Sequence, residues 1–574
     1  MKSKKRKKRM MQKIIPVIVA VALIIVIGGA AVAVELWDKY FGYSTEQVDM
    51  NGYYDIQNDS QAAIILNNEI LEVKALMREG HAYLDYANVR ELLNSRYYWD
   101  INENLLLVTT ANDIVKTEIG TDVYSVSGEQ IQMDHQLTMQ EEDSLYISLD
   151  YIQKYTDYTY ELFDSPNRIV VKNAWNSVNV ADVSKESAVR EFGGVKSSVL
   201  RPVEIGETLT VLEEMEEWDC VMTSDGMKGY IEKKHISPVR ELQEADPLVY
   251  AGEEYTSIKK DYKINLAFHP IYGQGGNDTF DTYVDGTGTM SIICPTWFQL
   301  MDNEGGYANY ASGAYVSKAH SRNMEVWAVL DNVNHPVDAV EIFGRTSKRE
   351  RLIASLMSDI ESNGIDGINL DIEMLNSDAV AGYVEFIREL SVACRQRGIV
   401  LSVDNYSPEG GANFGLSEQG RVVDYVILMG YDEHWGSGGV AGSVASIGFV
   451  ERGIQMMLDN GVPSDKLINA IPFYTRVWKT NGGTVTSDAL GMDRVQEFIS
   501  QYNVPVEWDA ETCQNYGEIE MGGILYQVWI EDKDSIETKL NVMKSYNLAG
   551  VGAWALGQEN KGIWPTIDKY ITGN

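Results

Sequence analysis

The sequence predicts an α/β protein whose largest part is a (β/α)8 TIM barrel, and three observations lead to that prediction. Within residues 248–574, short apolar runs alternate with longer amphipathic stretches such as 348–363 and 379–397. Such a segment is long enough for this barrel, which takes roughly 250 residues and grows with insertions. Eight runs favour strands, at 263–266, 290–293, 325–329, 367–370, 400–403, 425–429, 467–470 and 550–554.

Two smaller modules are predicted before the barrel. Residues 48–173 show short alternating runs, and Asn67-Asn68 predicts a tight turn between two strands. This segment resembles the copper amine oxidase N-terminal module, and we expect an α+β spacer. Residues 177–240 contain further strand-like runs, with Asp225-Gly226 as a hairpin turn. Their order resembles a bacterial SH3-like domain, a small β-barrel that often binds cell-wall peptides; a folded spacer is the alternative.

The N-terminus predicts a membrane segment. Residues 1–13 carry eight Lys and Arg residues and no acidic one, and residues 14–34 follow without a charge. Twenty-one apolar residues are enough for a transmembrane helix. Because basic flanks stay on the cytoplasmic side, we expect the remaining chain to be extracellular. A cleaved signal peptide is the alternative, since Ala31-Val32-Ala33 offers a cleavage site and would make the protein secreted.

Composition argues against several classes of partner. The net charge is −36, which disfavours nucleic acid because an acidic surface repels phosphates. The four cysteines stand far apart and form neither a CxxC pair nor a cluster with histidine, so we expect no zinc site and no disulfide framework. His269 and His335 lack partners at ligand spacing. We therefore expect no metal site at these histidines.

The fourth predicted strand carries an unusual row of polar residues. Alternate residues of a strand share a face, so Asn369, Asp371 and Glu373 point into the barrel, with Glu373 nearest the C-terminal rim. Asp366 lies out of phase with this row. Buried carboxylates cost desolvation energy, and neighbouring like charges raise one pKa, as a general acid requires. A hydrogen-bonded or cation-binding cluster is the structural alternative.

Several motifs in order carry a family resemblance. The octad 366–373, Asp-Gly-Ile-Asn-Leu-Asp-Ile-Glu, resembles the DGxDxDxE signature of glycoside hydrolase family 18, the chitinase-like enzymes. Residues 429–432, 472–476 and Trp554 resemble its motifs on the sixth, seventh and eighth strands. Residues 294–298 and 528–532 are similar to the branch of spore-cortex and cell-wall-lytic N-acetylglucosaminidases.

The resemblance implies roles for single residues. Glu373 would protonate the leaving glycosidic oxygen and later activate water. Asp371 would orient the 2-acetamido group of the substrate, and Tyr431 would hydrogen-bond the acetamido oxygen. Trp554 would form the floor of the distorted sugar's subsite, and Asp432 would orient the sugar or Asp371. Asp366 is expected to give structural support. The mechanism that the resemblance implies uses no metal and no organic cofactor.

Asn369 departs from the family signature, which has an aspartate there. Asparagine cannot titrate, but its amide can donate a hydrogen bond and hold Asp371 ionised. Further substrate contacts are expected from residues at or after strand ends, and packing within loops is the alternative for each. They are Trp297, Tyr474, Arg476 and Asn405, with Tyr406, His434 and Trp435 as further candidates.

The expected activity is hydrolysis of β-1,4 bonds in N-acetylglucosamine-containing polysaccharide by substrate-assisted retaining catalysis. Peptidoglycan ranks ahead of chitin, because a tethered enzyme with a wall-binding module would face the cell wall. Chitin or chitooligosaccharide hydrolysis is one alternative. A non-catalytic carbohydrate-binding surface protein on the same barrel is the other, although such proteins usually lack the acid that Glu373 provides.

Overall fold

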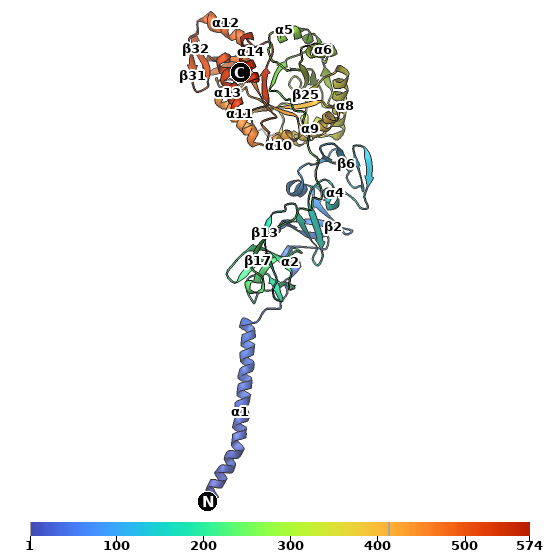
Figure 1. Cartoon of the computed structure of the whole chain (residues 1–574), viewed down its shortest axis with the longest axis vertical. Helices are drawn as coiled ribbons and strands as arrows, with labels where there is room; N and C mark the ends of the chain where they lie inside the picture. Colours follow the sequence, from blue (N-terminus) through green and yellow to red (C-terminus); the bar gives the residue numbers. More distant parts are fainter. Residues whose placement is uncertain (1, 411–413, 574) are drawn as a thin grey trace. The chain divides into compact units, whose positions relative to one another are not determined.

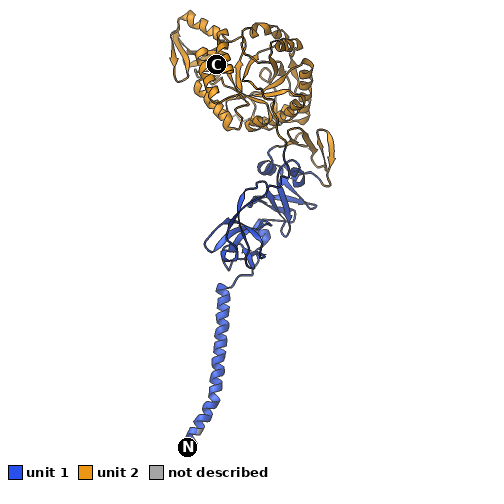
Figure 2. Ribbon diagram, in the orientation of Figure 1, with its two compact units in different colours: residues 1–95, 136–252 blue, residues 96–135, 253–574 orange. Residues whose placement is uncertain are grey.

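The computed structural model describes residues 2–410 and 414–573. The chain forms two compact units, which Figure 2 distinguishes by colour. One unit contains residues 1–95 and 136–252, and the other contains residues 96–135 and 253–574. The chain therefore passes from one unit to the other three times.

Helix α1 (Lys2–Phe41) begins the first unit and is blue in Figure 1. Within its segment Arg6–Phe41, an 18-residue apolar window has a mean hydropathy of 3.1, and none of that window is buried. The predicted membrane segment, 14–34, lies within it. Length and composition allow this helix to cross a bilayer, and a signal sequence near the N-terminus passes the same test.

A seven-stranded sheet of the first unit has the order β11-β12-β1-β2-β3-β10-β9. β1 (Gln61–Leu66) pairs antiparallel with β2 (Glu69–Arg78). Asn67 and Asn68 join them with φ of 48° and 71°, which asparagine tolerates, so the predicted turn is confirmed. The other strands are β3 (His81–Asp85), β9 (Thr138–Glu141), β10 (Ser144–Ser148), β11 (Thr159–Phe163) and β12 (Arg168–Lys172).

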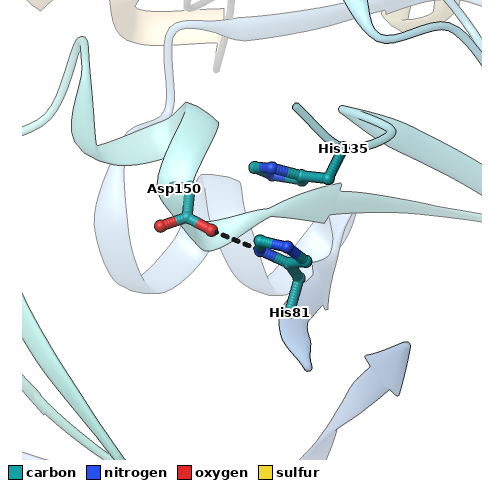
Figure 3. A group of neighbouring side chains, drawn as sticks. All are labelled: His81, His135 and Asp150. Carbon is teal, nitrogen blue, oxygen red and sulfur yellow. Dashed lines mark hydrogen bonds and ion pairs between the residues drawn. The ribbon is translucent and has the colours of Figure 1, made fainter. Parts of the chain in front are cut away.

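Short helices accompany this sheet: α2 (Met50–Tyr54), α3 (Tyr86–Asn88), a π-helical turn (Val89–Leu93) and α4 (Leu149–Gln153). At the start of β3, Nδ1 of His81 lies 2.9 Å from Oδ2 of Asp150 (Figure 3). Because Asp150 belongs to α4, this pair ties the helix to the strand.

The second sheet of the first unit has the order β15-β14-β18-β17-β16-β13-β19. Asp225 and Gly226 lie between two antiparallel strands, so the hairpin predicted there is confirmed. Side chains of both sheets, including Ile65 and Ile231, share one buried core. The SH3-like assignment stays a prediction. The strands are β13 (Ser177–Asp182), β14 (Ser187–Arg190), β15 (Val199–Val203), β16 (Thr208–Glu213), β17 (Trp218–Met222), β18 (Lys228–Glu232) and β19 (Arg240–Gln243).

Eight parallel strands form a closed barrel in the second unit. β20 pairs with β21 and β34, and β21 also pairs with β24, which completes the ring. Each strand overlaps one of the eight predicted runs, so the predicted (β/α)8 barrel is confirmed. The strands are β20 (Ile264–His269), β21 (Ile292–Pro295), β24 (Glu325–Asp331), β25 (Gly367–Asp371), β26 (Val400–Tyr406), β27 (Tyr425–Met429), β28 (Leu467–Pro472) and β34 (Gly550–Trp554).

Helices surround the barrel (Figure 1). Alternation along the strands separates two buried layers: Trp327 and Val329 belong to an inner cluster, whereas Leu401 and Val403 belong to the larger cluster that includes helix residues. The helices are α5 (Phe280–Val284), α6 (Gly313–Ser321), α7 (Ala339–Phe343), α8 (Thr346–Asn363), α9 (Ser377–Arg397), α10 (Leu416–Val422), α11 (Ile447–Asp459), α13 (Lys533–Ser545) and α14 (Trp564–Thr572).

Additional strands decorate the barrel. β22 (Phe298–Leu300) and β23 (Tyr307–Asn309) form a short hairpin after β21. Between β28 and α13 the chain inserts a five-stranded antiparallel sheet of order β30-β29-β33-β32-β31. This insertion places Tyr474 and Arg476 just beyond the end of β28. Its elements are β29 (Tyr474–Asn481), β30 (Thr484–Gly491), α12 (Met492–Tyr502), β31 (Val506–Asp509), β32 (Gln514–Met521) and β33 (Ile524–Ile530).

Residues 96–135 form a meander that packs on the barrel helices. Oδ2 of Asp100 accepts hydrogen bonds from the backbone N–H and the hydroxyl of Thr346, at 2.6 and 2.7 Å, at the start of α8. Thr109 donates to Glu385 of α9 at 2.6 Å. The strands are β4 (Tyr97–Asp100), β5 (Leu105–Thr109), β6 (Ile114–Glu118), β7 (Val123–Val126) and β8 (Glu129–Gln132).

Candidate active site

Three neighbouring strands each bring one carboxylate to the same level of the barrel. Asp331 of β24 pairs in register with Asp371 of β25. Leu370 pairs with Val403, so the following residues, Asp371 and Asp404, also lie side by side on β25 and β26. All three carboxylates line one cavity of about 800 Å³ at the C-terminal ends of the strands. A barrel of this kind carries its chemistry at that end.

Glu373 lies two residues beyond the end of β25 and is held by two neighbours. The side-chain oxygen of Asn332 accepts a hydrogen bond from the backbone N–H of Glu373 at 2.8 Å, and its amide donates to the Glu373 carbonyl at 2.9 Å. The hydroxyl of Tyr406 donates to the Glu373 carboxylate. Burial raises the pKa of Glu373 above its ordinary value, the Tyr406 hydrogen bond counteracts part of this rise, and Asp432 adds to it. A raised pKa suits a proton donor at neutral pH.

Asp371 is buried beneath the cavity, and its Oδ1 has no hydrogen-bond partner within the described residues. Burial raises its pKa well above the ordinary value, and the charges of Asp404, Glu373 and Asp331 raise it further. Burial also raises the pKa of Asp331 to about 6. Asp371 is thus a carboxyl group that holds its proton readily and lines the cavity in which a ligand would bind.

Aromatic residues of β29, β34 and the loop after β27 form part of the cavity wall. Tyr431, Tyr474 and Trp554 all line it, and Trp554 packs against Phe268 with ring centroids 5.6 Å apart. The hydroxyl of Tyr474 donates to Asp432 at 2.6 Å. Flat aromatic surfaces beside carboxylates suit a sugar, whose ring faces are apolar and whose edges carry hydroxyl groups.

Comparison with known proteins identifies the barrel. Residues 299–559 match the sequence model of Glycosyl hydrolases family 18, and residues 64–170 match the Copper amine oxidase N-terminal domain. The chain carries a glycosyl hydrolases family 18 domain. This family makes the protein a glycoside hydrolase, as the octad 366–373 predicted.

Relatives of the family 18 domain include named bacterial proteins. The uncharacterized glycosylase YvbX of Bacillus subtilis (strain 168) is 25% identical over 294 residues, which cover 49% of this chain and 84% of that protein. The cortical fragment-lytic enzyme of Bacillus anthracis is 25% identical over 254 residues, 42% of this chain and 58% of that enzyme. The C-terminal domain of a chitinase candidate from Desulfitobacterium hafniense DCB-2 has the same fold, with a TM-score of 0.50, 19% identity and coverage of 54% of this chain and 100% of that one.

Several predicted site residues of the family 18 domain do not line the cavity. Asp366, at the start of β25, accepts hydrogen bonds at 2.8 Å from His320 and from the backbone of Val326, which is structural support. Trp297 is fully buried, and its indole N–H donates to Asn277 at 2.8 Å.

Asn405 faces outward because it alternates with Asp404 and Tyr406 along β26. Its side-chain amide donates to the carbonyl oxygen of Gln419 at 2.7 Å. This position corrects the expectation that Asn405 contacts substrate. Arg476 lies outside the cavity lining, with Nη1 3.3 Å from the hydroxyl of Ser487 and Nη2 3.7 Å from Asp432.

Sequence reasoning missed Asp331, Asn332 and Asp404. The predicted strand 400–403 ended three residues too early, because β26 continues to Tyr406. The alternation of Ser402, Asp404 and Tyr406 was the available signal, since it places all three on the inner face. Tyr406 was considered as a sugar contact, but its hydrogen bond to Glu373 was not foreseen.

Proposed function

We propose that the family 18 domain hydrolyses β-1,4-glycosidic bonds in N-acetylglucosamine-containing polysaccharide, with peptidoglycan as the substrate, by substrate-assisted retaining catalysis. The observation that carries this proposal is the placement of Glu373 and Asp371 in one cavity, two residues apart at the rim of the barrel. The cavity is a site for a polymer segment because Tyr431 and Trp554 line it as well.

Glu373 is the proton donor in this proposal. Its carboxylic acid protonates the oxygen that leaves with the aglycone sugar, and the resulting carboxylate then takes a proton from the attacking water. The bidentate hold of Asn332 on the Glu373 backbone and the hydroxyl of Tyr406 fix the position of the carboxyl group. Such fixation supports catalysis because the acid meets the glycosidic oxygen without reorganisation.

Asp371 is the partner of the 2-acetamido group rather than a nucleophile. A carboxylate nucleophile must be ionised when the substrate arrives, whereas burial and three neighbouring carboxylates raise the pKa of Asp371 in the free protein. The carboxyl group of Asp371, which lines the cavity, accepts the acetamido N–H, so that the acetamido oxygen attacks the anomeric carbon. Tyr431 donates to that oxygen, Trp554 supports the distorted ring, and Asp432 binds the sugar or orients Asp371.

The ranking of peptidoglycan over chitin is supported by the relatives. The similar enzyme of Bacillus anthracis bears the name cortical fragment-lytic, which points to a cell-wall polymer. The layout of the chain fits a wall substrate. In our proposal residues 14–34 anchor the protein in the cell membrane with residues 1–13 in the cytoplasm, the 48–173 module acts as a spacer, and the SH3-like module 177–240 binds the wall.

Product analysis tests the function. The full-length protein in detergent is incubated with purified glycan strands of peptidoglycan and, separately, with chitin oligosaccharides, and the products are identified by mass. We expect fragments of the glycan strands ending in N-acetylglucosamine, formed initially as the β-anomer. Cleavage of chitin alone would reverse the ranking, and binding without any cleavage would favour the carbohydrate-binding alternative.

Attachment is tested separately. In membranes prepared from cells expressing the protein, we expect the intact N-terminus by mass spectrometry and release of the protein by detergent only. A mature N-terminus after residue 33 with soluble product would instead establish a cleaved signal peptide. Loss of wall sedimentation on deletion of 177–240 would support wall binding, and unchanged sedimentation would contradict it.

A further inference from the structure

Asp404 is a buried carboxylate of the cavity for which the proposed function has no role. Its side chain is 6% exposed and lies at the level of Asp371 on the neighbouring strand. Adjacent strands are roughly 5 Å apart, so the two carboxyl groups share a small, poorly hydrated space. Two carboxylates in such a space cannot both be ionised without a large electrostatic cost, and they therefore retain one proton between them.

Asn369 makes this pair asymmetric. Its side-chain amide donates to Oδ1 of Asp404 at 2.7 Å and to the hydroxyl of Ser402 at 3.0 Å. An amide donor stabilises the ionised form of the carboxylate that it contacts. Asp371 receives no such bond on its buried Oδ1 within the described residues. In the free protein the shared proton therefore resides on Asp371, and Asp404 is the ionised member.

We propose that Asp404 is a positioning residue that exchanges this proton with Asp371 during the reaction. The inference rests on the proposed function, because it gives Asp371 the role of acetamido partner. When Asp371 turns its carboxyl group to accept the acetamido N–H, its proton moves to the carboxylate of Asp404. Asp371 is then an anion and a stronger acceptor, and Asp404 is a neutral acid. The proton returns to Asp371 when the product leaves, so that no other reactant is needed.

The surroundings of Asp404 favour such an exchange. Burial raises the pKa of Asp404 above its ordinary value, the Asn369 hydrogen bond opposes the rise, and the charge of Glu373 adds to it. The other titratable groups that interact with Asp404 are neutral in their ordinary state: Cys294 of β21, Tyr383 of α9 and Tyr431, which follows β27. Asp331 lies beyond Asp371 and adds a further negative charge to the layer. Among the described residues, these interactions include no cation that would hold both carboxylates ionised.

Exchange of the carboxylate between strands is the decisive test. In the full-length protein, Asp404→Asn should lower kcat about tenfold or more and change the pH profile of kcat, while KM changes little. The double variant N369D/D404N places a carboxylate beside Asp371 again, now from β25. We expect it to recover at least about a third of the decrease in log kcat that Asp404→Asn causes. Asp424→Asn is the matched control: this buried carboxylate accepts bonds from the backbone of Ile258 and Leu401, and its loss should leave the pH profile unchanged.

The inference is wrong if Asp404→Asn has the kcat and the pH dependence of kcat of the wild type. It is also wrong if Asp404→Asn loses kcat and the double variant does not recover any of that loss. Either outcome leaves the proposed function intact if the wild-type protein cleaves the polymer. If the wild-type protein cleaves nothing, the proposed function fails, and the shared proton is tested by stability instead.

The stability test uses pH. The pair binds its shared proton more tightly in the folded state than the unfolded chain does, so the contribution of that proton to stability is present below about pH 4 and is lost as pH rises from there through the raised pKa of the pair. Asp404→Asn should therefore reduce the loss of stability across this window. Ser402→Ala removes another partner of Asn369 and should lower stability equally at every pH. If the unfolding free energies of the wild-type protein and Asp404→Asn depend on pH in the same way, the inference of a shared proton is wrong.

Discussion

The hydroxyl of Tyr406 on β26 donates a hydrogen bond to the carboxylate of Glu373, which follows the neighbouring strand β25. This bond favours the ionised form of Glu373 and so holds its pKa below the level that burial alone would produce. Tyr406→Phe should raise the pKa of Glu373 by about one unit, since a hydrogen bond to a charged group contributes roughly 1.5 kcal/mol or more. The alkaline limb of kcat/KM, which reports the acid, should move to higher pH.

The control for this variant is Tyr425→Phe. The Tyr425 hydroxyl accepts a bond from the backbone of Lys260 at 2.8 Å, away from the cavity lining. Its pH–rate profile should match the wild type. A profile of Tyr406→Phe that moves to lower pH would contradict the assignment of Glu373 as the acid.

Glu373→Gln should remove the proton donor while preserving the shape of the cavity. We expect kcat to fall by about 10²- to 10⁴-fold, the usual contribution of general acid–base catalysis, with sugar affinity retained. Rates from product analysis and affinity from calorimetry check both parts. Glu361→Gln, which alters an exposed ion pair with Arg397, is the control. Equal rates for the two variants would remove Glu373 from the mechanism.

His269 should make the protein less stable in acid. The side chain is fully buried between Tyr315 and Thr279, at 2.7 and 2.9 Å, and burial lowers its pKa to about 4. Since the unfolded chain binds a proton near pH 6.5, stability is present above that pH and is lost as pH falls towards 4. The loss should reach up to roughly 3 kcal/mol. Denaturant unfolding between pH 4 and 7 measures this loss. His269→Gln should make the unfolding free energy depend less on pH. An equally strong pH dependence in the variant would show that His269 is not the cause.

Arg349 of α8 and Glu389 of α9 form a buried ion pair, with 0% and 1% of their side chains exposed and 2.8 Å between Nη2 and Oε1. Arg349→Ala leaves the Glu389 charge buried without its partner and should cost about 3–5 kcal/mol of unfolding free energy. Arg397→Ala breaks the exposed pair with Glu361 and should cost about 0–1 kcal/mol. Chemical denaturation compares them; similar losses would show that burial does not determine the cost.

Asp100 binds the first turn of α8 from outside the helix. Its carboxylate accepts from both the backbone and the hydroxyl of Thr346, and it is 1% exposed. Asp100→Ala should lower the unfolding free energy by about 1–3 kcal/mol, because two buried donors lose their acceptor. Asp122→Ala, at an exposed carboxylate bonded to Gln132, should change it by less than about 0.5 kcal/mol. The prediction fails if both variants unfold at the same denaturant concentration.

Local pattern was sufficient to predict the barrel. Each of its eight strands is a short apolar run, and the row Asn369, Asp371, Glu373 could be assigned to the inner face from alternation alone. Strand ends were harder to predict, since polar residues inside a barrel look like the start of a loop. That is why Asp404 was missed and Asn405 was chosen in its place.

Contacts between distant segments could not be predicted from one sequence. The meander 96–135 resembles the strands around it, and nothing local distinguishes it from the 48–173 module. Its grouping with the barrel depends on partners roughly 250 residues away, such as Asp100 with Thr346. The hydrogen bond from Tyr406 to Glu373 likewise depends on strand register, which fixes neighbours only after the barrel has closed.

The meander has a consequence for how this protein can be divided or recombined. Because the chain crosses between the two units after residues 95, 135 and 252, no single cut yields both units with all their strands. A truncation at 252/253 would separate the barrel from a segment that covers α8 and α9. A shortened form of the hydrolase should therefore keep residues 96–135, either by circular permutation or by co-expression of this segment with the barrel. After limited proteolysis, residues 96–135 should stay bound to the barrel.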